Sequence, residues 1–163
     1  MPLRQGGFNI IELMVVVAVM GVMMALALPA MQDMIASQRV KSSSYELNAD
    51  LTFARSEAIS RGSNVDVSSA SGTTNWQGGW TITTLNPADG TTITLRQADA
   101  RSSGLTFTGP GPTVTFDRTG RGTAAGTVQF SIVPTNASAP DHQKRCLRLD
   151  PSGRVRTRQE ACS

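Results

Sequence analysis

The chain has 163 residues, of which 39 % are hydrophobic and 17 % are charged, and its formal net charge is +3. This length allows one soluble domain beside a membrane segment, and so small a net charge excludes no class of partner. No phosphate-loop or nucleophile-elbow signature is present, and no cluster has the spacing of metal ligands. His142, the one histidine, lies in a loop-like setting. We therefore expect neither an enzyme nor a cofactor or metal.

The N-terminal segment is almost free of charge. No side chain from Leu13 to Leu28 is charged or carries a hydroxyl group. An apolar run of about 20 residues can span a bilayer as a helix, and Arg4 in the short leader favours a cytoplasmic N-terminus. The pattern predicts a single-pass anchor over residues 8–30, with the rest of the chain outside. Glu12 is the exception, because a carboxylate in a membrane segment is costly and indicates a function.

The residues around Glu12 form a recognisable motif. Gly7-Phe8-Asn9-Ile10-Ile11-Glu12-Leu13 resembles the class III signal of type IV pilins and type II secretion pseudopilins, with Asn9 and Ile10 in place of the commoner Thr and Leu. The resemblance implies that a prepilin peptidase removes a leader of residues 1–7, cutting between Gly7 and Phe8, and methylates the Phe8 amine. It also implies a bacterial inner-membrane protein with a periplasmic C-terminal domain, which is extracellular when in a pilus.

The same resemblance suggests a role for Glu12. Its carboxylate is expected to meet the Phe8 amine of a neighbouring pilin subunit. Two charges that are each costly in lipid then compensate one another only when the neighbour is in register.

Residues 31–62 continue as an amphipathic helix. The apolar stripe recurs at three- and four-residue spacing, at Val40, Ser44, Leu47, Leu51, Ala54 and Ala58, and charged residues, Asp50 among them, lie off it. The helix is expected to run from Phe8 to Arg61, about 80 Å long, and to end with Gly62 as its C′ residue. Pro29 should kink or locally loosen it.

Residues 63–163 are expected to form one β-rich domain. From Asn64 the pattern has a period of two, which predicts strands at 65–69, 79–85, 91–96, 105–108, 113–117 and 127–133. Asn86–Gly90 is typical of a hairpin loop. A long helix packed on antiparallel sheet is an α+β arrangement, here the type IV pilin-like fold.

Two further stretches narrow the family. Trp76-Gln77-Gly78-Gly79-Trp80 and Phe116-Asp117-Arg118-Thr119-Gly120-Arg121-Gly122 resemble elements of the GspH/FimT class of minor pilins and pseudopilins. We expect both tryptophans to pack against the helix. The alternative is that they stack on a sugar or peptide.

The C-terminal stretch predicts a basic β-hairpin. Asp150-Pro151-Ser152-Gly153 fits a tight turn, and strand alternation places Leu147 and Leu149 on the face opposite Cys146 and Arg148. Six basic residues and one acid, Asp150, lie between Lys144 and Arg158. Beyond a membrane, Cys146 and Cys162 are expected to pair and to staple the tail.

The hairpin has two interpretations. Gly153-Arg154-Val155-Arg156 resembles a Gly-Arg-x-Arg element of FimT-like minor pilins, which are implicated in DNA capture during natural transformation. That resemblance implies sequence-independent contacts to duplex DNA phosphates, centred on Arg154 and Arg156 and supported by Gly153, Arg148, Arg158, Lys144 and Arg145. No aromatic residue is interleaved, so base stacking has little support. The alternative is a purely structural pseudopilin that initiates assembly for type II secretion, with a hairpin that contacts a neighbouring subunit.

Overall fold

The computed structural model describes residues 9–101, 103–136 and 139–163, and only the backbone at 26–30. The chain divides into two compact units, a segment that ends at Ile35 and a domain over Ala36–Ser163, and each is described by itself. The predicted leader, including Gly7, and Phe8 lie outside the described residues.

One long helix begins the described chain. Helix α1 spans Ile10–Arg61. At its start, the Asn9 side chain accepts a hydrogen bond from the Ile11 amide, 3.4 Å away, as an N-cap residue does. It ends at Gly62, whose φ of 62° confirms the expected C′ glycine. Pro29 lies within α1, and the expected kink there stays a prediction. In the part of the chain that was described, no helix is long and apolar enough to cross a membrane.

The C-terminal part of α1 packs into the domain core through the predicted stripe. All six stripe residues are buried: Val40, Ser44, Leu47, Leu51, Ala54 and Ala58. The prediction that Asp50 lies outside the buried face is wrong, because this side chain is only 4 % exposed. Its carboxylate accepts a hydrogen bond from Trp80 Nε1 at 2.8 Å and pairs with Arg96 at 2.7 Å, and these partners compensate its burial.

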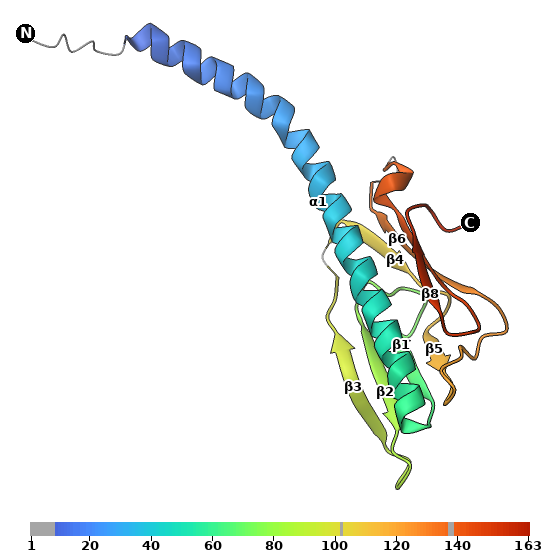
Figure 1. The fold of residues 1–163 in the computed structure, drawn as a ribbon. Coiled ribbons are helices and arrows are strands. Elements are labelled where there is room, and N and C mark those ends of the chain that lie inside the picture. Colours follow the sequence, from blue (N-terminus) through green and yellow to red (C-terminus); the bar gives the residue numbers. More distant parts are fainter. Residues whose placement is uncertain (1–8, 102, 137–138) are drawn as a thin grey trace, which may run out of the picture. The chain divides into compact units, whose positions relative to one another are not determined.

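Most of the rest of the domain forms two four-stranded antiparallel sheets. The sequence had predicted antiparallel sheet but not its division into two. Figure 1 shows β1–β3 lying along the C-terminal part of α1. The first sheet has the order β3-β2-β1-β5 and the second β4-β6-β7-β8. The strands are β1 (Val65–Ser69), β2 (Trp80–Leu85), β3 (Thr92–Ala98), β4 (Leu105–Thr108), β5 (Thr113–Phe116), β6 (Val128–Pro134), β7 (Arg145–Leu149) and β8 (Val155–Arg158). A short 3-10 helix, η1 (Asp141–Gln143), which the sequence did not predict, precedes β7.

The core lies among α1 and both sheets and is rich in aromatic rings. Trp76 and Trp80 are fully buried, which confirms that they pack in the interior. Trp76 meets Phe130 of β6 edge-on at 4.9 Å between ring centroids, and Trp80 meets Phe107 of β4 at 5.6 Å. Because the buried core residues all fall between Val40 and Leu149, the domain over Ala36–Ser163 contains its own core.

Candidate functional site

The predicted basic hairpin is formed by β7 and β8, and β8 is an edge strand of the second sheet. Its register pairs Arg148 with Arg156 and Cys146 with Arg158. Leu147 and Leu149 are buried on the other face, which confirms the predicted alternation. Two arginines directly opposite each other on neighbouring strands repel. The hairpin therefore carries a concentrated positive charge that the fold must compensate locally or leave to a partner.

The hairpin turn is fixed by a close backbone contact. Gly153 donates its amide to the Asp150 carbonyl at 2.8 Å, the predicted four-residue turn. Its φ is 77°, and a Cβ atom here would lie 1.9 Å from the Gly120 carbonyl oxygen. Gly153 is buried, so its contribution to the site is the conformation of the turn.

Gly120, opposite this turn, belongs to the Phe116–Gly122 stretch that resembles the GspH/FimT class. The Asp117 carboxylate accepts hydrogen bonds from the Thr119 hydroxyl at 2.6 Å and from the Thr119 and Arg121 amides at 2.8 and 3.0 Å. These hydrogen bonds hold the pKa of Asp117 below its usual value of 3.8, and the bond from the Thr119 side chain has the largest effect. Asp117 therefore organises the loop against which the hairpin turn packs.

The three arginines that follow the hairpin turn, Arg154 just before β8 and Arg156 and Arg158 on it, differ in their partners. Arg154 and Arg156 are exposed, and no ion pair or side-chain hydrogen bond joins Arg154 to any residue that the structure describes. Arg156 Nε lies 3.5 Å from Asp150 Oδ2, and Arg158 lies 3.4 Å from Glu160 Oε1. These contacts are long and solvent-exposed, and such pairs contribute about 0–1 kcal/mol.

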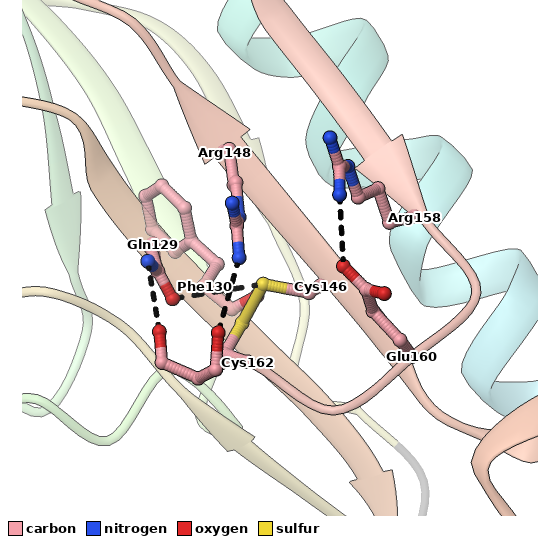
Figure 2. The surroundings of a disulfide bond; sticks show 8 residues. Gln129, Phe130, Cys146, Arg148, Arg158, Glu160 and Cys162 are labelled. Carbon is pink, nitrogen blue, oxygen red and sulfur yellow. Dashed lines mark hydrogen bonds and ion pairs between the residues drawn. A yellow bond between two sulfur atoms is a disulfide. The ribbon is translucent and has the colours of Figure 1, made fainter.

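Arg148 is less accessible than the sequence suggested. Figure 2 shows the disulfide that joins Cys146 of β7 to Cys162, so that the C-terminal segment lies beside Arg148. This confirms the predicted pairing, with 5.1 Å between the Cα atoms. Arg148 donates to the Ser163 hydroxyl at 3.4 Å, and its Nε atom is buried. Arg148 and Arg156 face each other across the hairpin, and of the two Arg156 is the more accessible to a ligand.

The remaining predicted basic residues lie at the other end of β7. Lys144 forms an ion pair with Asp141 at 3.1 Å, and Arg145 donates to the carbonyls of His142 and Lys144 at 2.8 Å each. His142 is exposed, as predicted. Sequence reasoning did not foresee that Asp141 and Glu160, just outside the basic stretch, would neutralise part of it. The signal available in the sequence was that Asp141 lies three residues before Lys144 and Glu160 two residues after Arg158.

The predicted assembly site is described only in part. Glu12 lies in the first turn of α1 and is exposed. Counting from the Asn9 cap, it occupies the N3 position, where a carboxylate is favoured by the helix dipole. The Asn-x-x-Glu spacing signalled this local role in the sequence. The local fold thus offsets part of the cost of the Glu12 charge within a single chain.

Comparison with known proteins agrees with this architecture. The fold is similar to that of the type IV minor pilin FimU of Pseudomonas aeruginosa, at 26 % identity and a TM-score of 0.64, over 76 % of this chain and 92 % of the other. It also shares its fold with the minor pseudopilin EpsH of the Vibrio cholerae type 2 secretion system, at 19 % identity and a TM-score of 0.57, over 74 % and 96 % of the two chains.

Sequence comparison extends the likeness to fimbrial proteins. A fimbrial protein of Pseudomonas aeruginosa is 38 % identical over 86 residues, which are 53 % of this chain and 55 % of that protein, so the match spans about half of each. The family model described as type II transport protein GspH matches residues 44–153 and ends in the hairpin turn, before β8. The chain therefore belongs to the GspH family, among the minor pilins and pseudopilins with the type IV pilin-like fold.

Proposed function

We propose that this chain is a minor subunit of a type IV pilus that also binds duplex DNA through the β7–β8 hairpin. In this proposal, residues 8–30 anchor the chain in the bacterial inner membrane and the domain over Ala36–Ser163 is periplasmic. Prepilin peptidase removes residues 1–7 and methylates Phe8. Family membership and the Gly7-Phe8…Glu12 spacing support processing and assembly with other pilins.

The Glu12 carboxylate is the proposed contact between subunits, through the Phe8 amine of a neighbour. Glu12→Ala should leave the protein inserted in the membrane and cleaved after Gly7, but should strongly reduce its recovery in sheared filaments. Asp33→Ala is the matched control, because it removes another exposed carboxylate from α1. Equal recovery of both variants would refute this role for Glu12.

The observation that carries the DNA-binding proposal is the pair Arg154 and Arg156. Both are exposed, Arg154 immediately before β8 and Arg156 on this edge strand of the second sheet, and Arg154 has no ionic partner among the described residues. Guanidinium groups on a rigid strand bind phosphate oxygens through charge-assisted hydrogen bonds without reading bases. Lys144, Arg145 and Arg158 add positive charge at the end of the hairpin away from the turn.

A second candidate function is a purely structural pseudopilin of a type II secretion system. The ion pairs of Arg156 with Asp150 and of Arg158 with Glu160 favour it, because a partly neutralised hairpin needs no polyanion. Against this, exposed ion pairs are weak, so a phosphate can replace Asp150 or Glu160 at little cost.

Duplex binding by the full chain in nonionic detergent separates the two candidates. Fluorescence anisotropy should show binding at low salt, with a similar Kd for unrelated sequences. Arg154→Gln and Arg156→Gln should each weaken binding and reduce the slope of log K against log salt by about 1. Arg61→Gln removes the same charge at the end of α1 and should change neither quantity. Absence of binding at low salt would favour the structural candidate.

A further inference from the structure

A polar pocket lies between α1 and the end of the basic hairpin. It has a volume of about 380 Å³ and is lined by Lys41, Ser44 and Tyr45 of α1 and by Arg145, Thr157, Arg158 and Gln159 of the hairpin. The helical lining and the strand lining lie at least 100 positions apart in the sequence. Only the folded domain brings these groups to one place.

The lining of this pocket is cationic. It contains three basic side chains, Lys41, Arg145 and Arg158, and no carboxylate. Lys41 forms no ion pair within the described residues, and its ammonium lies 6.0 Å from the Tyr45 ring centroid. Arg145 donates through Nη1 to two carbonyls, and Arg158 has only its exposed contact with Glu160 at 3.4 Å. Three like charges around one pocket repel one another, and an anion that enters it relieves this repulsion.

The pocket adjoins the proposed DNA-binding strand. Arg158 lines the pocket and lies two residues after Arg156 on β8, so both side chains point to the same side of the strand. Lys41 and Arg158 therefore continue the line of basic side chains towards α1. A phosphate group suits this lining, because it presents several acceptor oxygens to donors that converge from two elements.

We propose that this pocket binds a phosphate group of the DNA backbone, with Lys41 as the residue that extends the interface from the hairpin onto α1. This inference rests on the proposed DNA-binding function and adds a second site of contact to it. Tyr45, which is 61 % exposed, also lines the pocket. It adds to the lining an aromatic side chain, which the hairpin sequence lacks.

The first test is the salt dependence of duplex binding by the full chain in nonionic detergent. Lys41→Gln should raise Kd several-fold and lower the slope of log K against log salt by about 1. Lys41→Arg keeps the charge and should retain the wild-type slope, and Arg61→Gln is the control for net charge. Arg61 lies 20 residues further along α1, about 30 Å away. Lys41 is exposed, so the substitution should leave the fold intact.

The results separate this inference from the function on which it rests. If Arg154→Gln and Arg156→Gln weaken binding while Lys41→Gln behaves like Arg61→Gln, the pocket inference is overturned and the hairpin proposal stands. If Lys41→Gln weakens binding while the hairpin variants do not, the pocket is supported and the hairpin proposal fails.

A second test uses inorganic phosphate as the probe. Titration followed by NMR should shift the Thr157 and Gln159 amides in a saturable way, and Lys41→Gln should remove these shifts. If phosphate leaves the amides unmoved, the pocket is not a phosphate site. If phosphate binds but duplex DNA does not, a free phosphate is its source and the proposed DNA role is refuted.

Discussion

Gly153→Ala tests whether the glycine of the Gly-Arg-x-Arg element shapes the turn. Alanine disfavours the left-handed φ of 77° found here, at a cost of about 1–2 kcal/mol. The added Cβ atom would also lie 1.9 Å from the Gly120 carbonyl oxygen and 3.0 Å from Arg55 Nε. Because the nearer atom belongs to the backbone, relief requires the turn to move, which costs roughly a further 1–3 kcal/mol.

We therefore expect Gly153→Ala to destabilise the domain by about 3 kcal/mol, close to a 10 °C loss in Tm for a domain of this size. The assay is thermal and urea unfolding of the domain over Ala36–Ser163. Gly126→Ala is the matched control, because a Cβ atom there meets no atom within 4 Å and φ is not positive. If the Gly153→Ala domain unfolds within about 0.5 kcal/mol of this control, the turn does not require a glycine at position 153.

Three further predictions concern stability. Asp50→Ala should cost about 2–3 kcal/mol in urea unfolding, because it leaves Trp80 Nε1 buried without an acceptor; a cost no larger than that of Asp99→Ala, which removes an exposed carboxylate from the same domain, would contradict this. Replacing Cys146 and Cys162 by serine should cost about 3 kcal/mol through loop closure, and an unchanged Tm would show that the bridge contributes nothing. Since the pKa of Asp117 is lower in the folded state, its stabilisation is present above pH 3.8 and is lost as pH falls through the folded pKa. The difference in unfolding free energy between wild type and Asp117→Asn should accordingly shrink on acidification. A difference that grows as the pH falls would contradict a lowered pKa of Asp117 in the folded state.

Much of the fold could be predicted because local patterns agreed with the tertiary structure. The stripe from Val40 to Ala58 has the helical period and is buried, and Gly62 ends the helix as expected. The turn at Asp150–Gly153 carries residues that suit its conformation. In each case the physical cause lies within a few residues of the signal.

What the sequence could not supply depends on contacts between distant residues. Asp50 looked like a surface residue because its partners, Trp80 and Arg96, are 30 and 46 residues away. The division into two sheets depends on β5 pairing with β1 and β4 with β6. Strand periodicity does not encode such choices of partner.

The candidate site shows the same limit. The sequence located the arginines correctly, but it did not show that the C-terminal segment would cover part of Arg148. Nor could it show that Lys41 and Tyr45 of α1 would share a pocket with Arg145 and Arg158. Accessibility depends on neighbouring segments, which a count of charges does not include.

The most direct test of the DNA-binding claim observes the arginine side chains themselves. The Nε–Hε resonances can be followed by NMR in the domain over Ala36–Ser163 while a short duplex is added at low salt. We predict saturable shifts for Arg154 and Arg156, smaller ones for Arg148, and none for Arg61, with the same pattern for unrelated duplex sequences. Unmoved Arg154 and Arg156 resonances at saturating duplex, or shifts spread equally over all arginines, would contradict it.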